Sequence, residues 1–518
     1  MENFKNQSSP LLQSWAMVYE SVRLGNLASA IDLLEEMSLL EVPPHQKSEI
    51  LNGLAAVLAA EGHEFQASAA CDLALRVTPN DTNVKETLQL LLEGTRPLAD
   101  GVKTKERPFK IAILSLLFNW PSTGGGIVHT YELAVALGHA GFSVCHIFAQ
   151  YDGWKVGCVE GDYLVPHVVV PFDEPEWNAP SIRSRFREIV DQFSPDIVII
   201  TDSWNCKPLL AEAVNGYNYL IRIAAMETLC PLNNVRLLFD ATGAALTCAK
   251  DQLSDPMYCR QCVATNAGFS GSLHAAERDL AGFHNPDYPT RLRHSIANAH
   301  AVFVVNPKIA DVMAPYNQRV HVVPSGFDAK RFPISLALGS RSGDRKLLQI
   351  LFAGLTDEYM KGFAVLLEAG KVLWSRRQDF EIVATGNPPG QLNAYTRLIG
   401  WQSQEDLPLT LADADILAFP TLAEEGLGRS AVEAMACGRP VVASRIGGLK
   451  WIVEHNRTGL LHEPGDVGGL VTALQRLLDD DLLRLRMGLE GRKKFESELT
   501  WEVILERHYI PLFDSLRS

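Results

Sequence analysis

The chain has 518 residues, which is too long for one domain and suits three. Its formal net charge of −14 argues against a nucleic-acid partner, because phosphate backbones select basic surfaces, and it weakens the case for docking on anionic lipid. No apolar run approaches the length of a membrane span, and residues 1–17 lack the basic start and apolar core of a secretory signal. The sequence therefore predicts a cytoplasmic protein whose nine cysteines are thiols or metal ligands rather than disulfides.

Residues 1–95 are expected to form a small all-α domain. Apolar and small residues recur at helical spacing in five segments, which are residues 12–25, 27–40, 47–62, 64–77 and 83–92. Gly25 is followed by Ala30 and Gly62 by Ala67, each five residues further on, and the second unit resembles a tetratricopeptide repeat. Such a domain is either a binding surface for a protein partner or a helical cap without a function of its own.

A linker at residues 96–108 leads into an α/β domain expected at 109–325. The apolar run 109–118 predicts a buried strand, and three glycines separate it from a helical segment. A glycine loop at such a junction lets the backbone approach a ligand closely, so Gly125 and Gly126 are candidate binding residues. Further apolar strands alternate with helical stretches, which predicts a mostly parallel sheet.

An irregular insert with four cysteines, residues 226–265, interrupts this domain. The cysteines are Cys230, Cys248, Cys259 and Cys262, and the last two form the sequence CRQC. A Cys-x-x-Cys knuckle with two further thiols can close a tetrahedral zinc site, so the insert is a candidate structural zinc site. The alternative is four ordinary buried thiols.

A second α/β domain is expected at residues 326–505. It opens with the strand 348–354, and the strand 380–386 follows after a helical stretch that contains Lys361. Ligands of parallel sheets bind at the carboxyl ends of the strands, so Gly386 is a candidate ligand-binding residue.

The strongest signal is the unit of residues 416–444, which reads as strand, glycine loop, short helix and strand. Gly428 allows a sharp turn, and a helix is expected to start near Ser430. A helix N-terminus that leaves a glycine loop at the carboxyl edge of a sheet is a ready site for an anion.

Two carboxylates, Glu425 and Glu433, lie in this unit with seven residues between them. One precedes the helix and the other lies about one turn into it, so both can face one crevice at different depths. Carboxylates accept hydrogen bonds from sugar and ribose hydroxyls well. A ligand with hydroxyls at both ends and an anion in the middle, such as a nucleotide sugar, suits this arrangement.

The run EEGLGRSAVEAMACGRPVVAS (424–444) resembles the signature of family 4 retaining glycosyltransferases. The run GGGIVHTYELAVALGHAGFSV (124–144) resembles the start of the same family, and HVVPSGFDAKRF (321–332) resembles its interdomain segment. The resemblance covers about residues 109–516. It implies the GT-B fold, in which two doubly wound Rossmann-like α/β domains face a cleft, and a terminal helix at 506–518 that packs back on the first of them.

The resemblance also assigns roles to single residues. His129 would hydrogen-bond the donor sugar, Lys361 would pair with the donor diphosphate, Glu425 would hold sugar hydroxyls and Glu433 the ribose. The chain departs from the family where an arginine usually follows the first strand of the second domain, because Leu355 stands there. Arg429, beside the helix N-terminus, is the candidate substitute.

The implied reaction is the transfer of a hexose from a nucleoside diphosphate sugar to a hydroxyl of a glycan, a lipid-linked acceptor or a small molecule. It would proceed with retention of configuration and without a catalytic metal, since a preorganised cation and backbone amides can stabilise the leaving group. A glycosidase also uses two carboxylates, but needs them to flank one bond. The remaining alternative is a non-catalytic nucleotide-sugar-binding scaffold that binds partners through its helical repeats.

Overall fold

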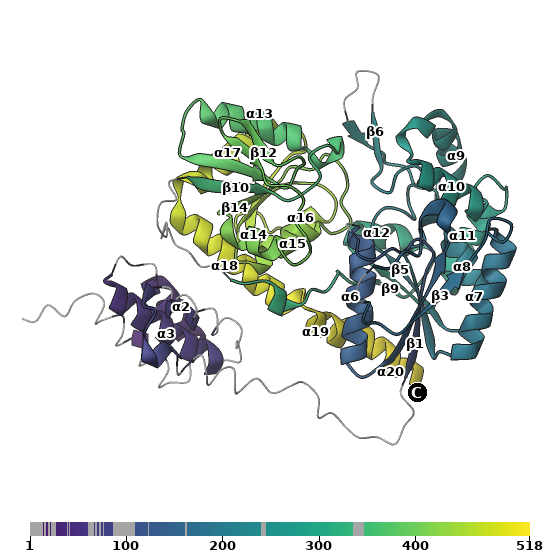
Figure 1. The fold of residues 1–518 in the computed structure, drawn as a ribbon, viewed down its shortest axis with the longest axis horizontal. Coiled ribbons are helices and arrows are strands. Elements are labelled where there is room, and N and C mark those ends of the chain that lie inside the picture. The colour runs from purple at the N-terminus through teal and green to yellow at the C-terminus, as the bar shows by residue number, and fades with distance from the viewer. Residues whose placement is uncertain are drawn as a thin grey trace, which may run out of the picture. The chain divides into compact units, whose positions relative to one another are not determined.

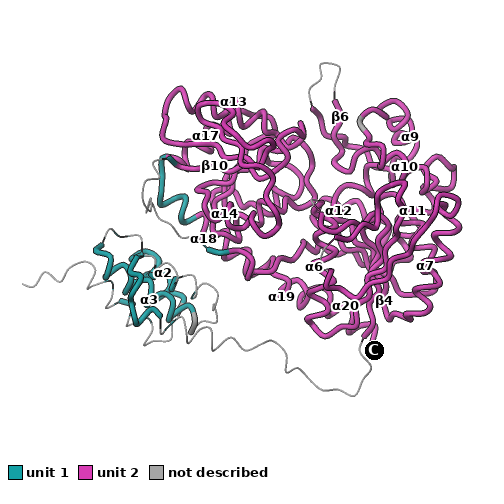
Figure 2. The backbone as a smooth tube through the Cα atoms, viewed as in Figure 1, with its two compact units in different colours: residues 1–104, 333–347, 479–486 teal, residues 105–332, 348–478, 487–518 magenta. Residues whose placement is uncertain are grey.

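The computed structural model describes residues 109–334 and 347–517, except 123, 161–162 and 240–244, together with parts of residues 14–87 that include 27–38, 42–60 and 77–85. The chain divides into two compact units, shown in Figure 2. The first unit comprises residues 1–104, 333–347 and 479–486, and the second comprises 105–332, 348–478 and 487–518. Among the helices that the structure describes, none combines the length and apolar character that a membrane span requires.

In the first unit, α2 (Leu27–Ser38) and α3 (Pro44–Ala60) coincide with two of the expected helices. Leu34 of α2 and Leu54 of α3 belong to an apolar cluster whose members all lie between residues 18 and 84, so this region buries apolar side chains of its own. The other expected helices and the linker at 96–108 fall largely or wholly outside the described residues. The tetratricopeptide-like repeat therefore stays a prediction.

The first half of the second unit (residues 109–332) is built on a seven-stranded parallel sheet of order β3-β2-β1-β4-β5-β8-β9. The strands are β1 (Lys110–Ser115), β2 (Ser143–Gln150), β3 (His167–Pro171), β4 (Ile197–Thr201), β5 (Tyr219–Ile223), β8 (Ala301–Val304) and β9 (Val320–Val322). The main covering helices are α6 (Gly125–His139), α7 (Ala179–Phe193), α8 (Lys207–Ala213), α11 (Tyr288–Asn298) and α12 (Pro307–Met313). The expected parallel sheet is confirmed.

Helices cover both faces of this sheet, which explains why its strands are apolar throughout rather than alternating. Alternate side chains of β1 belong to different clusters: Ile113 packs with Leu137 of α6, and Leu114 packs with Phe186 of α7. Figure 1 shows α6 and α7 on opposite sides of the strands.

The second half of this unit (residues 348–478 and 487–500) is built on a sheet of order β12-β13-β11-β10-β14-β15-β16, parallel except at the β12–β13 edge. The strands are β10 (Leu348–Phe352), β11 (Phe380–Ala384), β12 (Gly390–Asn393), β13 (Thr396–Leu398), β14 (Ile416–Phe419), β15 (Val441–Ser444) and β16 (Gly459–His462). The helices are α13 (Phe363–Trp374), α14 (Leu407–Asp413), α15 (Arg429–Ala436), α16 (Leu449–Ile452), α17 (Val467–Asp479) and α18 (Asp481–Glu498). Two Rossmann-like sheets, as expected, therefore make up this unit.

The end of the chain returns to the first sheet. It forms α19 (Trp501–Ile504), a π-helical turn (Leu505–Tyr509) and α20 (Ile510–Arg517). Phe513 of α20 stacks on Phe109 with ring centroids 5.4 Å apart, and Trp501 and Tyr509 belong to the same buried cluster as β1. The two halves of the unit are therefore joined by two chain segments, one near Phe327 and one near Thr500, which form a β-bridge with each other.

Candidate functional site

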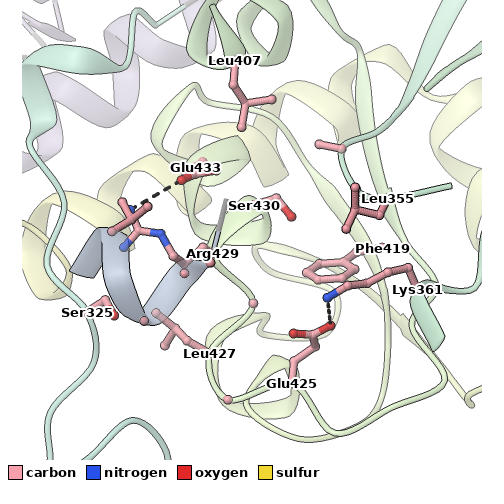
Figure 3. A pocket seen from close by; sticks show the side chains of 18 of the residues that line it. Ser325, Leu355, Lys361, Leu407, Phe419, Glu425, Leu427, Arg429, Ser430 and Glu433 are labelled. Atoms are coloured by element: carbon pink, nitrogen blue, oxygen red, sulfur yellow. Dashed lines mark hydrogen bonds and ion pairs between the residues drawn. The ribbon is translucent and has the colours of Figure 1, made fainter. Parts of the chain in front are cut away.

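A cavity of about 430 Å³ lies at the carboxyl ends of the strands of both sheets, and Figure 3 shows its lining. The first half contributes Gly124, Gly125, Gly126, Val128, Ala224, Ala225 and Ser325. The second half contributes, among others, Leu355, Glu358, Lys361, Thr385, Trp401, Gln402, Gln404, Phe419 and residues 425–430 with Glu433. A cavity of this size holds a ligand with the dimensions of a nucleotide.

Two helices begin at the wall of this cavity. α15 starts after Gly428, whose φ is 87°, and α6 starts after Gly124. Both N-cap residues are glycines, so neither helix has a hydrogen bond from an N-cap side chain to its first N–H groups. The uncapped N–H groups and the positive end of each helix dipole face the cavity, which favours an anion there.

The backbones of the two halves approach each other closely at Gly426. A Cβ at this position would lie 2.3 Å from the carbonyl oxygen of Ala224, so only glycine lets the two backbones meet. Asn306 reinforces this contact, because its Nδ2 donates a hydrogen bond to the Gly426 carbonyl at 2.7 Å.

Lys361 and Glu425 point toward one another at the cavity wall (Figure 3), with Nζ 2.9 Å from Oε1. Burial acts to lower the pKa of Lys361, but the charge and the hydrogen bond of Glu425 outweigh it, so the pKa of Lys361 is raised. Burial also raises the pKa of Glu358, which lies near the same ammonium. Lys361 is thus held charged beside the helix N-termini.

Arg429 lies between the two halves rather than free in the cavity. Its Nη2 donates to both oxygens of Glu132, on α6, at 3.0 and 3.2 Å, and its guanidinium lies 4.4 Å from the ring centroid of Phe327. Arg331 also pairs with Glu132, at 2.8 Å. Within the described residues, Nη1 of Arg429 is buried without a hydrogen-bond partner.

Glu433 lines the cavity, and its side chain is almost fully buried. Its Oε1 lies 3.7 Å from Nη2 of Arg429 (Figure 3). Burial raises the pKa of Glu433, and the positive charge of Arg429 opposes that rise. Such a carboxyl is ready to accept hydrogen bonds from a ligand hydroxyl that enters the cavity.

The structure brings most of the predicted site residues together in this cavity. Those that line it are Gly125, Gly126, Lys361, Glu425, Gly428, Arg429, Ser430 and Glu433. Gly386 does not line it, although the preceding Thr385 does. His129 is also absent from the lining, because its side chain is buried and only 1% exposed. The centroids of the His129 and Trp501 rings are 5.2 Å apart. Burial lowers the pKa of His129 well below its usual value, so the ring is neutral.

Several lining residues were missed at the sequence level, among them Glu358, Thr385, Trp401 and Gln404. Thr385 follows β11, and Trp401 follows β13 after a glycine, so both lie at the same carboxyl edge as the α15 loop. Because ligands bind at the carboxyl ends of parallel strands, Thr385 and Trp401 could have been predicted from the sequence.

The four cysteines of the insert come together, but not as a metal centre. They line one small cavity with apolar neighbours such as Leu229 and Leu238. Among the described residues no group of three or more His, Cys, Asp or Glu is arranged to hold a metal ion. The sulfurs of Cys248 and Cys262 instead accept hydrogen bonds from nearby nitrogens, and burial raises the pKa of Cys259 to about 12. The predicted structural zinc is therefore not supported.

The architecture matches solved structures of the GT-B glycosyltransferase type. Sucrose-phosphate synthase from Thermosynechococcus elongatus aligns with a TM-score of 0.55 and 18% identity over 79% of this chain and 100% of that chain. Anabaena HepE in complex with UDP-glucose aligns with a TM-score of 0.52 and 15% identity over 79% of this chain and 99% of that chain. At these identities the likeness shows the fold alone.

Residues 348–480 match the family model described as Glycosyl transferases group 1. The matched segment contains Lys361, Glu425 and Glu433. The second half of the α/β unit is therefore similar to glycosyl transferases of group 1.

Curated relatives point to the same class. One is the GDP-mannose-dependent monoacylated alpha-(1-6)-phosphatidylinositol monomannoside mannosyltransferase of Corynebacterium glutamicum, which is 33% identical over an alignment of 211 residues. This alignment covers 36% of this chain and 54% of that protein. Another is the D-inositol 3-phosphate glycosyltransferase of Pseudarthrobacter chlorophenolicus, which is 30% identical over an alignment of 218 residues that covers 38% of this chain and 51% of that protein. The chain thus spans about half the length of the curated relatives it matches.

Proposed function

We propose that this protein is a glycosyltransferase that moves a hexose from a nucleoside diphosphate sugar to an acceptor hydroxyl, with retention and without a catalytic metal. The observation that carries the proposal is the cavity in which two uncapped helix N-termini, a charged lysine and two carboxylates converge.

The diphosphate would lie against the N-terminus of α15, where the amides around Ser430 face the cavity. Negative charge grows on this group as the bond to the sugar breaks, and preorganised amides and the Lys361 ammonium oppose that charge. A single preorganised donor can supply about 3–4 kcal/mol of transition-state stabilisation, so we propose that these groups together neutralise the leaving group without a metal.

Lys361 and Glu425 would exchange partners when the donor enters. In the free protein each neutralises the other at 2.9 Å. With donor bound, the ammonium turns to the diphosphate and the carboxylate accepts hydrogen bonds from the hexose hydroxyls. Glu433 would hold the ribose, and the half-exposed Trp401 at the cavity mouth offers a flat face to the base.

The donor class is supported by the relatives, one of which is named as GDP-mannose-dependent. A structural neighbour was solved with UDP-glucose. We propose a glycan, a lipid-linked molecule or a small molecule as the acceptor, since the named relatives include a phosphatidylinositol mannoside mannosyltransferase and an inositol phosphate glycosyltransferase. Residues 1–95 would add a surface for a protein partner.

The experiment is a thermal-shift panel of UDP- and GDP-hexoses, followed by donor hydrolysis of any hit in the presence of a chelator. We expect one nucleotide sugar to raise the melting temperature and to be hydrolysed slowly without added metal. Lys361→Ala is the control, because it should keep the fold and lose the hydrolysis. A shift without hydrolysis by the wild type would favour the scaffold, and no shift with any donor would contradict both functions.

A further inference from the structure

The cysteine insert contacts the second half at two places, each within two residues of a member of the Lys361–Glu425 pair. Arg236 Nη1 lies 3.6 Å from Glu424 Oε2, one residue before Glu425. Phe239 lies 5.5 Å, ring centre to ring centre, from Tyr359, two residues before Lys361. Both contacts come from one short segment that enters the hairpin β6 (Leu237–Phe239) and β7 (Ala245–Thr247).

Arg236 is buried and is held in place by the backbone of the insert. Its φ is 56°, which a non-glycine residue adopts only under constraint, and its side chain is 3% exposed. Its Nη2 donates to the carbonyl of Lys250 at 3.0 Å, and its own carbonyl accepts from the Cys248 amide at 2.8 Å. The segment that carries Cys248 thus determines where this guanidinium lies.

Glu424 is the receiving group in the second half. Its carboxylate is 4% exposed, and it lies between two cations of the first half, Arg236 and Lys308. Lys308, on α12, bonds the other oxygen and is 45% exposed. A buried carboxylate needs a cation to offset its lost hydration, so we expect the position of the Glu424 carboxylate to depend on Arg236 and Lys308.

Glu424 directly precedes two residues that line the cavity. Glu425 is the next residue, and its carboxylate takes the Lys361 ammonium. Gly426 follows and is held by Asn306 at 2.7 Å. A shift of Glu424 would therefore displace the carboxylate assigned to the hexose.

We propose that Arg236 is a positioning residue, and that the insert orients Glu425 for the donor sugar through the Arg236–Glu424 ion pair. This inference rests on the proposed function. The insert then belongs to the sugar end of the site, while the nucleoside diphosphate end depends on the α15 N-terminus. Loss of the ion pair should harm sugar recognition and turnover more than binding of the bare nucleoside diphosphate.

The test compares Arg236→Met with Lys308→Met, since each removes one of the two cations around the same carboxylate. We expect Arg236→Met to lower kcat by about tenfold while the Kd of the nucleoside diphosphate stays within about twofold. Lys308→Met, at a half-exposed position, should lower kcat by less than about threefold. Arg236→Lys, which keeps a charge, should recover part of the lost kcat.

A double-mutant cycle with Glu424→Gln decides whether Arg236 acts through Glu424. In the Glu424→Gln background, Arg236→Met should change kcat by no more than about twofold further. Fully additive losses, or an equal loss of nucleoside diphosphate affinity, would overturn the inference. If Arg236→Met does not fold, Glu424→Gln alone tests the same ion pair from its other side, and an unchanged kcat in that variant overturns the inference.

The same measurements separate this inference from the proposed function. A wild type that neither binds nor hydrolyses any nucleotide sugar refutes the function and the inference together. An active wild type with an additive cycle refutes the inference alone.

Discussion

The α15 unit (residues 416–444) and the cysteine insert (residues 226–265) differ in how much of their structure and role can be predicted from residues that are neighbours in the sequence. In the α15 unit, strand, glycine loop, helix and strand follow one another in sequence and lie together in space. In the insert, the residue pattern indicated a metal, but the described residues form no metal-holding group, and the contacts that matter reach to Glu424 and Tyr359, far along the chain. A site built on one helix N-terminus can therefore be predicted from residues that are neighbours in the sequence. A supporting contact between distant segments cannot.

The largest effect should come from Lys361, the cation of the α15 side. Lys361→Ala removes the charge that faces the leaving diphosphate, so we expect kcat to fall about a hundredfold or more. Steady-state donor hydrolysis measures this, with circular dichroism as the control for folding. If turnover were retained, the cation would not act on the leaving group.

A slightly smaller loss is expected from Gly426, where the backbones of the two halves meet. In Gly426→Ala the new Cβ would lie 2.3 Å from the Ala224 carbonyl oxygen, so the halves must separate. We expect kcat/KM to fall by about thirtyfold. Ala431→Gly on α15 is a matched backbone control, and a comparable loss in that variant would show general disruption instead.

Glu433 should affect donor binding rather than turnover. Its assigned ribose contact is equal in the ground and transition states, so Glu433→Gln should raise the donor KM by about tenfold and leave kcat nearly unchanged. Kinetics over a range of donor concentrations separate the two constants. A fall in kcat with constant KM would instead assign Glu433 to the reacting centre.

Glu277, which follows the insert in the chain, should make the stability of the first half depend on pH. This buried carboxyl, on α10 (Ser272–Ala281), accepts hydrogen bonds from Asn205 and the Cys206 amide, and burial raises its pKa to about 7. Because the folded pKa exceeds the unfolded one, the free energy of unfolding should fall as the pH rises from about 4.5 to about 7.

Urea unfolding at pH 6 and pH 7 measures this effect. The decline should be smaller by about 1 kcal/mol in Glu277→Gln, which cannot ionise. An identical decline in both proteins would show that Glu277 is ionised throughout the range.

The smallest effect is expected at the thiols. Cys262→Ser should lower the free energy of unfolding by less than about 1 kcal/mol, because the partly exposed sulfur accepts only a weak bond from Asn266. A chelator should leave the unfolding curve of the wild type unchanged. A large loss in both experiments would restore the zinc site and contradict the structure described above.

Much of the fold could be predicted from sequence because the strands of both sheets are short apolar runs bounded by helices and glycines. The placement of Glu425, Glu433 and Ser430 followed from spacing around one helix. The burial of His129 could not be predicted, since it depends on Trp501, which arrives from the far end of the chain. Arg429 lines the cavity, but its bond to Glu132 joins residues of the two halves and could not be predicted from the neighbouring sequence.

The most direct test of the central claim is a calorimetric titration of GDP and UDP into the wild type and Lys361→Ala in metal-free buffer. The account predicts that one nucleoside diphosphate binds at one site per chain, and that Lys361→Ala weakens its binding by about tenfold. The corresponding monophosphate should be affected less, because it lacks the phosphate nearest the sugar. Failure of both diphosphates to bind, or equal affinities in the two proteins, would contradict the account.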